Sequence, residues 1–263
     1  MTLTLSGATL RSVAQSLRHL AYTPSSWHGV LNHHSPTVRD QLEPVLVEMK
    51  AEGARPKLMA LLLEHLADTQ DSMQHERDAW RFVWSGPEPL HAKTADTLAT
   101  VHQLINEARD NLLIATYNIG LSDDIQSFLE KIAGRIERKD LNHVDLFFHP
   151  IQIIERLGTD RQETISKWFN NVVWPWAGKP RAHIDQRLIQ GGNTQCSQHA
   201  KVVIADAGTA WARALVTSAN FSESAQRNNY EAGWLVTNPW RADQINQHFQ
   251  DLVSSGQFLR INP

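Results

Sequence analysis

QHAKVVIAD, the stretch from Gln198 to Asp206, is the part of the chain that indicates most about its fold. Its apolar centre, residues 202–205, is rich in β-branched side chains and predicts a buried strand. Because side chains along a strand alternate between two faces, we expect His199 and Lys201 on one face and Asp206 on the other, at the strand's end. An imidazole that titrates near neutrality then lies beside a fixed cation, a pairing that suits attack on a phosphate.

Two more strands are predicted downstream, each with polar side chains at one end. The apolar run at 214–216 leads into Ser218 and Asn220, which share a face because they are two residues apart. Glu231 opens a third apolar run at 231–236. A packed core does not need polar residues at three strand ends, so the pattern indicates a site.

The order of these residues, His-x-Lys-x4-Asp, then Ser-x-Asn, then a glutamate at the start of a strand, resembles the phospholipase D superfamily. The resemblance covers roughly residues 84–263 and is sharpest over 198–236. Thr217 stands where the family often has glycine, and the interval between Asp206 and Ser218 is somewhat long. A helical N-terminus and a single motif in a chain of this length are also similar to the phospholipase D-like proteins of bacterial anti-phage defence.

The resemblance implies a metal-independent phosphodiesterase in which two His-Lys motifs meet at one site. One histidine attacks phosphorus and becomes a phosphohistidine, and the other protonates the leaving oxygen. This chain has one complete motif, so we expect a homodimer in which two His199 side chains form one composite site. Pairing with a different motif-bearing chain is the alternative. No cofactor and no metal ligand set are expected.

We expect different roles for the different candidate site residues. Asp206 completes the motif, but we expect it to shape the hairpin or to bind backbone amides. Ser218 and Asn220 are expected to contact substrate, although turn formation at a strand end is the simpler alternative. Surface placement is an equal alternative for the residues just before Glu231. The candidates are His199, Lys201, Asp206, Ser218, Asn220 and Glu231 for catalysis, with Arg227 and Asn229 for substrate binding.

Composition favours a folded protein outside the membrane. The chain has 263 residues, of which 41% are apolar, and contains no apolar run of the roughly 18 residues that a spanning helix needs. Cys196 is the single cysteine, so no disulfide within the chain can form, which fits a reducing cytoplasm. The net charge is −3, yet residues 179–227 hold six Lys and Arg against three Asp and Glu. This local excess indicates either ordinary surface charge or a shallow groove for a phosphate backbone.

Two domains are predicted. Residues 1–84 form a helical N-terminal domain, with helices expected to run to about residue 82, Pro36 at a helix start, and Pro44 kinking or breaking that helix. The pair Gly86-Pro87 marks the boundary. Residues 85–263 alternate strand and helix patterns, which predicts an α/β domain with a mixed sheet flanked by helices.

The sequence is compatible with three functions. The leading hypothesis is a nuclease, with DNA as the most favoured substrate, in intracellular bacterial defence and in contact with other defence proteins. Phospholipid hydrolysis or phosphatidyl transfer is the second. The third is a non-catalytic nucleic-acid-binding subunit of a defence complex, joined through the helical N-terminal domain.

Overall fold

The computed structural model describes residues 5–19, 28–87, 94–191, 198–222 and 229–261. The chain divides into two compact units, Met1–Asp78 and Ala79–Pro263. Each unit has a hydrophobic core of its own, made by separate clusters of buried side chains.

Unit 1 is helical in its described residues. Its helices are α1 (Gly7–His19), α2 (His28–Leu31), α3 (Pro36–Ala51) and α4 (Pro56–Asp78). Apolar residues at helical spacing bury one side of α1, including Leu10, Val13 and Leu17, against the rest of the unit. Ion pairs between α1 and α4 flank this contact, where Arg11 binds Asp68 and Asp71, and Arg18 binds Glu64.

Two features of the expected helical domain differ from the structure. The helical segment ends at Asp78 rather than near 82, because Trp80–Ser85 form strand β1, which pairs with a strand of unit 2. The burial of β1 alternates along the chain, with Val83 fully buried, which is the period of a strand and not of a helix. Helix α3 also continues through Pro44, so of the two expected effects the break does not occur, and buried Leu42 and Leu46 flank this position.

Unit 2 is built on one nine-stranded sheet with the order β2-β1-β8-β7-β6-β3-β4-β5-β9. The strands β3, β4 and β5 are parallel, and β6, β7 and β8 form an antiparallel meander beside them. The predicted mixed sheet is confirmed. The strands are β1 (Trp80–Ser85), β2 (Ala95–Asp96), β3 (Asn111–Thr116), β4 (His143–Phe148), β5 (Arg181–Asp185), β6 (Val202–Ala205), β7 (Arg213–Thr217), β8 (Glu231–Val236) and β9 (Phe258–Arg260).

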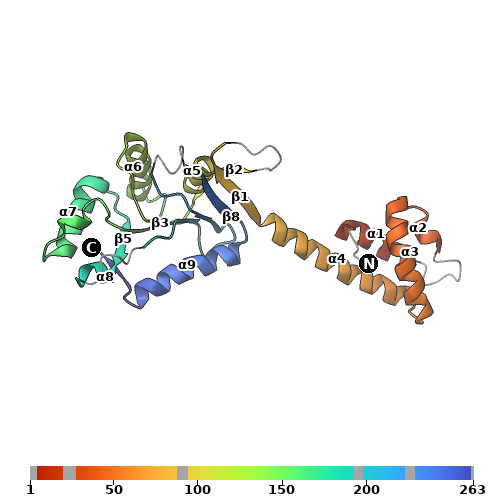
Figure 1. Cartoon of the computed structure of the whole chain (residues 1–263). Helices are drawn as coiled ribbons and strands as arrows, with labels where there is room; N and C mark the ends of the chain where they lie inside the picture. Colours follow the sequence, from red (N-terminus) through yellow and green to blue (C-terminus); the bar gives the residue numbers. More distant parts are fainter. Residues whose placement is uncertain (1–4, 20–27, 88–93, 192–197, 223–228, 262–263) are drawn as a thin grey trace. The chain divides into compact units, whose positions relative to one another are not determined.

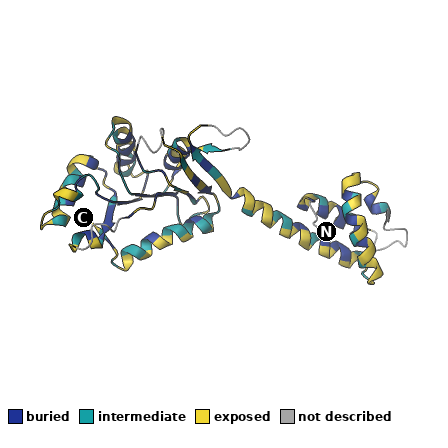
Figure 2. Cartoon of the chain, in the orientation of Figure 1, coloured by how far each residue is buried: buried dark blue, intermediate teal, exposed yellow. Residues whose placement is uncertain are grey.

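Helices cover both faces of the sheet (Figure 1). Side chains along β6 alternate between the two faces of the sheet. Val203 packs in the hydrophobic cluster that includes residues of α5, α6 and α7. Val202 and Ile204 pack in the cluster that includes residues of α9. The burial colouring of Figure 2 follows this arrangement, with the strands dark and the outer helix sides exposed. The helices and turns are α5 (Thr97–Glu107), α6 (Asp123–Glu137), η2 (Ile154–Arg156), α7 (Arg161–Trp168), η3 (Phe169–Val173), α8 (Gln186–Ile189) and α9 (Pro239–Ser254).

The topology brings several strand ends to one edge of the sheet. Because β6 and β7 are antiparallel, Lys201 just before β6 meets Thr217 at the end of β7, whose N–H donates to the Lys201 carbonyl. Ser218 then bonds through its backbone N–H to Ala232 at the start of β8. The ends of β3 and β4 pair at Thr116 and Phe148, on the same edge. Residues that follow β3, β4 and β7 and precede β6 and β8 are therefore gathered together.

Candidate active site

The His199 and Lys201 side chains meet at this edge of the sheet. Lys201 Nζ lies 2.8 Å from Nδ1 and 3.2 Å from Nε2 of His199, and it donates to the His199 backbone carbonyl at 2.9 Å. Strand β6 begins only at Val202, so the contact forms in the segment that enters the strand. His199 is exposed, whereas Lys201 is 7% exposed. The ring is thus open to solvent while the cation beneath it is held by the fold.

Burial changes the electrostatics of Lys201. Removal of the ammonium from water lowers the pKa of Lys201 from its ordinary value of 10.5, and the charge of Glu231 opposes this in part. A lysine is seldom buried without a carboxylate in direct contact. Here the ammonium is bound instead by an imidazole and a carbonyl, which leaves part of its charge available to an anion.

Ser218 and Glu231 form the second pair of the site. The Ser218 hydroxyl donates to Glu231 Oε2 and accepts from the Ala232 N–H at 3.1 Å. Asn229 donates to the other carboxylate oxygen of Glu231 at 3.4 Å. These contacts fix the carboxylate at the start of β8, within electrostatic reach of Lys201.

Asn220 is held by the loop after β3. Its Oδ1 accepts from the Asn118 N–H at 3.3 Å, which leaves the Asn220 amide NH₂ as a donor. The same loop is attached once more where the Thr116 hydroxyl accepts from the Phe221 N–H at 2.9 Å. The turn after β7 and the turn after β3 therefore support one another, although 105 residues separate their contacts in the chain.

Two aromatic residues join the site that sequence reasoning did not include. Tyr117, directly after β3, lies against His199 with ring centroids 4.8 Å apart, and Lys201 Nζ lies 5.8 Å from its ring centroid. His149, directly after β4, stacks on Tyr117 at 5.1 Å. Both could have been found by the rule that identified Ser218, because they too are polar side chains at the ends of apolar strands.

His149 is buried in this cluster. It is 2% exposed, and its Nδ1 has no hydrogen-bond partner among the described residues. Burial lowers the pKa of His149, the Asp185 carboxylate opposes that shift, and the charge of His199 adds to it. Burial therefore favours the neutral ring of His149, which lies within electrostatic reach of His199.

Asp206 is placed at the other end of β6. It is 2% exposed, and its Oδ1 accepts from the backbone N–H groups of Arg109 and Asp110 at 2.7 and 2.9 Å. Its φ of 58° begins the hairpin between β6 and β7. The structure thus gives Asp206 the backbone contacts that sequence analysis expected of it, and it does not bring the side chain to His199.

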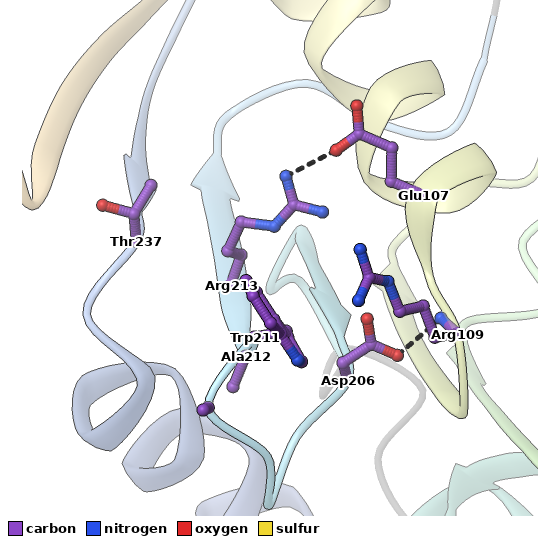
Figure 3. A pocket seen from close by; sticks show the side chains of 8 residues that line it. Glu107, Arg109, Asp206, Trp211, Ala212, Arg213 and Thr237 are labelled. Carbon is purple, nitrogen blue, oxygen red and sulfur yellow. Dashed lines mark hydrogen bonds and ion pairs between the residues drawn. The ribbon is translucent and has the colours of Figure 1, made fainter.

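A cavity of about 520 Å³ lies beside Asp206, with Arg109, Trp211 and Arg213 in its lining (Figure 3). His199 and Lys201 do not line it. The guanidinium of Arg109 packs on the ring of Trp211 at 4.8 Å, and Arg213 pairs with Glu107 at 2.8 Å. With two basic and two acidic side chains, the lining has no net charge to select an anion. We therefore place the candidate chemistry at the His199 edge. Arg227, a candidate for phosphate contact, lies outside the described residues.

Comparison with known families agrees with the geometry. Residues 151–253 match the family described as "Cardiolipin synthase, PLD-like domain", which includes the segment carrying His199, Lys201, Ser218 and Glu231. This segment of the chain is therefore similar to a phospholipase D-like domain. The match begins after β4, so it covers the motif strands β6, β7 and β8 but not the Tyr117 loop.

Individual relatives of the chain are distant. The DISARM protein DrmC of Bacillus paralicheniformis is 24% identical over 192 residues, which span 72% of this chain and 70% of that protein. A phospholipase D family member, Nuc, from Salmonella typhimurium is 17% identical, with a TM-score of 0.43, over 69% of this chain and 96% of its own. NucT from Helicobacter pylori is also 17% identical, with a TM-score of 0.42, over 62% and 89%.

In the part of the chain that the structure describes, no helix combines the length and apolar character needed to cross a bilayer. Within the same residues, no three His, Cys, Asp or Glu side chains are grouped as ligands for a metal ion.

Proposed function

We propose that this protein is a phosphodiesterase that cleaves nucleic acid, with DNA as substrate, through a phosphohistidine intermediate. The observation that carries the proposal is the contact of 2.8 Å between buried Lys201 and exposed His199, at an edge that also holds Ser218 and Glu231. A phosphodiester is an anion, so its attack requires a nucleophile together with a cation that neutralises the phosphoryl oxygens.

The reaction takes two steps and uses His199 from two copies of the chain. In the first, the unprotonated ring of one His199 attacks phosphorus, a P–N bond forms, and the P–O bond to the leaving group breaks. The leaving oxygen takes a proton from the second His199, which is protonated at the start. In the second, water attacks phosphorus, the P–N bond breaks, and the proton of water passes to the second His199. The products are a phosphomonoester and an alcohol.

Lys201 changes partners during this reaction. In the absence of substrate its ammonium contacts both ring nitrogens of His199. A bound phosphate draws the ammonium toward the phosphoryl oxygens, because a full negative charge attracts it more strongly than a neutral ring. This movement uncovers a ring nitrogen for attack, so substrate binding and activation of His199 are coupled.

The remaining polar groups orient the phosphate. The free NH₂ of Asn220 donates to a non-bridging oxygen, and the Ser218 hydroxyl rotates from Glu231 to do the same. Glu231 then accepts from the imidazole of the second copy and fixes its orientation. Asn229 holds the Glu231 carboxylate, and Arg227 contributes positive charge.

The choice of substrate and setting rests on two separate supports. The excess of basic residues between 179 and 227, in a chain of net charge −3, supports a nucleic-acid backbone as the substrate. The similarity to the DISARM protein DrmC supports a role in anti-phage defence, in contact with other defence proteins. Two copies are proposed because the chain has one complete His-Lys motif.

The test is cleavage of single- and double-stranded DNA and RNA in the presence of EDTA. We expect cleavage of DNA by the wild-type protein and none by His199→Ala. The matched control is His248→Ala, which removes an exposed histidine on α9 outside the site. Acid-labile, base-stable phosphate on the wild-type protein identifies phosphohistidine. Activity that depends on added metal, or that survives His199→Ala, contradicts the mechanism.

Phosphatidyl transfer is the second candidate, and the description of the matching family as a cardiolipin synthase domain favours it. The same proteins are assayed with phosphatidylglycerol vesicles. Release of glycerol or formation of a transfer product, lost in His199→Ala and without DNA cleavage, would assign the site to phospholipid chemistry. Binding of DNA with no turnover of either substrate would favour the non-catalytic subunit.

A further inference from the structure

Strands β1 and β8, which lie side by side in the sheet (Figure 1), carry aromatic side chains on one of its sides. Every second residue of β1 from Trp80 onward is aromatic, and Val83 between them is fully buried, so the rings point away from that core. In the register of the two strands, Trp234 lies opposite Phe82. None of these rings is part of the hydrophobic clusters found in the described residues. We call aromatic face the residues Trp80, Phe82, Trp84, Tyr230 and Trp234.

The rings of the aromatic face are exposed and touch one another. Trp80, Trp234 and Tyr230 have exposed fractions of 39%, 48% and 73%, and the other two rings are half-buried. Ring centroids are 5.3 Å apart for Phe82 and Trp234, 6.4 Å for Phe82 and Trp84, and 6.0 Å for Trp84 and Tyr230. A continuous apolar surface of this kind marks an interaction site in a folded protein.

The turn after β1 fixes two of these rings. The Trp84 indole N–H donates to the Pro87 carbonyl at 3.1 Å, so its polar atom is satisfied and its orientation is set. Gly86 has a φ of 133°, and a Cβ there would lie 2.6 Å from Cδ1 of Tyr230. The glycine therefore provides the space that the Tyr230 ring occupies. Rings that are oriented before binding lose little conformational entropy when a ligand covers them.

The aromatic face is continuous with the His199 edge. Tyr230 directly precedes Glu231, and Trp84 lies opposite Ala232 in the register of β1 and β8. The Ala232 N–H in turn donates to the Ser218 hydroxyl at 3.1 Å. Because neighbouring strands are about 5 Å apart, the face begins one strand away from the Ser218–Glu231 pair. A ligand with its phosphate at this pair has its adjoining groups above Trp84 and Tyr230.

The chemistry of the face differs from that of the edge. Lys201 supplies a cation at the edge, whereas no member of the aromatic face is charged. The edge therefore suits an anion, and the face suits flat, uncharged groups joined to that anion. Unpaired nucleobases have this character, since they stack on aromatic side chains through their π-faces. Bases in a duplex are covered on both faces by their neighbours and cannot stack in this way.

We propose that the aromatic face binds the unpaired bases of a single-stranded nucleic acid whose phosphodiester lies at the His199 edge. The inference rests on the proposed function for the kind of substrate, and it adds that the preferred form is single-stranded. Stacking reads neither the identity of the base nor the sugar, so the face selects strandedness and not sequence.

The first experiment measures the affinity for oligothymidylate by fluorescence anisotropy, in the His199→Ala background so that the strand is not cleaved. Trp234→Thr, which keeps a strand-forming residue, and Tyr230→Ser are each expected to raise the dissociation constant on the order of 10-fold or more. Tyr230→Phe keeps the ring and should bind as the parent does. Trp211→Ala is the control for loss of an exposed tryptophan, because Trp211 lies in the turn between β6 and β7, outside the face.

The second experiment separates stacking from phosphate contacts. An abasic strand of the same length presents the phosphates without the bases. Parent and Trp234→Thr should bind this strand with the same affinity, although they differ for oligothymidylate. Added salt weakens the phosphate contacts in both proteins, so the ratio of their dissociation constants for oligothymidylate should persist. Circular dichroism and the melting temperature confirm that each variant is folded. Oligouridylate should bind like oligothymidylate, since stacking does not read the sugar.

Several outcomes overturn the inference. Duplex DNA bound as tightly as the single strand does so, as do unchanged affinities in Trp234→Thr and Tyr230→Ser. A ratio that is the same for the abasic strand also does so, because the ring would then act on something other than a base. Occupation of the face by a second copy, seen as self-association that Trp234→Thr abolishes, assigns the rings to protein contact.

The results also distinguish this inference from the proposed function. Ring-dependent binding of single strands, without cleavage by the wild-type protein, supports the aromatic face and contradicts the nuclease. Cleavage that needs His199 but treats single and double strands alike, and is unchanged in Trp234→Thr, supports the nuclease and overturns the aromatic face.

Discussion

The ring of Tyr117 packs against the ring of His199, with centroids 4.8 Å apart and the planes at 47°. Tyr117 is itself stacked on His149 at 5.1 Å, and His149 is anchored at the buried end of β4. A column of packed rings thus leads from buried His149 to the exposed imidazole of His199. The position of His199 is set by this column as well as by Lys201.

Tyr117→Ala should lower kcat by about 10- to 100-fold, because removal of the ring lets His199 move by an ångström or more from its position beside Lys201. KM should change less, since the phosphate contacts are made by other residues. Tyr117→Phe keeps the ring and serves as the matched control, with near wild-type kcat. Steady-state cleavage of DNA measures both constants. Loss of activity in Tyr117→Phe would instead assign the hydroxyl a direct chemical role.

The motif strands could be predicted from sequence, and the aromatic column could not. The sequence predicts strand β6 at its observed bounds, because a short apolar run rich in β-branched residues is typical of a buried strand. Helix α5 begins after its N-cap Asp96, whose side chain accepts from the Ala99 N–H at 2.7 Å. The Tyr117–His199 contact joins residues 82 positions apart, and no local pattern specifies which strand ends become neighbours.

The boundary between the units shows a second limit to what the sequence alone can predict. Trp80–Ser85 contains three aromatic residues and one valine, which fit either a helix end or a strand. Pairing with β8 decides the matter, because Trp80 to Ser85 align with Val236 to Glu231 residue by residue. Long-range pairing of this kind overrides local preference, as it commonly does for sheet edges.

Lys201→Met should lower kcat by about 10²- to 10³-fold, since the phosphoryl charge then lacks its cation. Burial lowers the pKa of Lys201 below 10.5, so the ammonium is lost at a lower pH than for an exposed lysine. Activity that needs the cation is therefore present below that pKa and falls as the pH rises through it. A pH–rate profile for kcat should show this alkaline limb below pH 10.5.

Lys201→Arg is the control for that limb, because a guanidinium stays charged throughout the accessible range. We expect a lower rate, since the planar group fits the Lys201 position poorly, and no decline at alkaline pH. An alkaline limb that persists unchanged in Lys201→Arg would show that another group titrates there.

Asp206→Ala should reduce the free energy of unfolding by about 1–3 kcal/mol, because the N–H groups of Arg109 and Asp110 lose their acceptor. The φ of 58° at Asp206 adds strain for alanine. Asp206→Asn retains the acceptor and tolerates this φ, so its stability should stay near wild type. Urea unfolding measures the difference. Both variants should keep kcat per folded molecule, and a loss of kcat in stable Asp206→Asn would indicate a catalytic carboxylate.

His149 should make the fold sensitive to acid. Its pKa in the folded state is lowered, chiefly by burial, relative to the unfolded chain. The neutral ring is therefore favoured on folding, and this contribution is fully present above the ordinary value of 6.5 and is lost as the pH falls toward the folded pKa. The melting temperature of the wild-type protein should drop between about pH 7.5 and pH 5. His149→Phe keeps the stacking on Tyr117 without a titratable group, so its melting temperature should fall less over the same interval. His248→Phe, at an exposed position, should retain the wild-type slope. An equal slope in His149→Phe and wild type would show that His149 does not carry the acid sensitivity, and that its neutral form is not what the buried end of β4 selects.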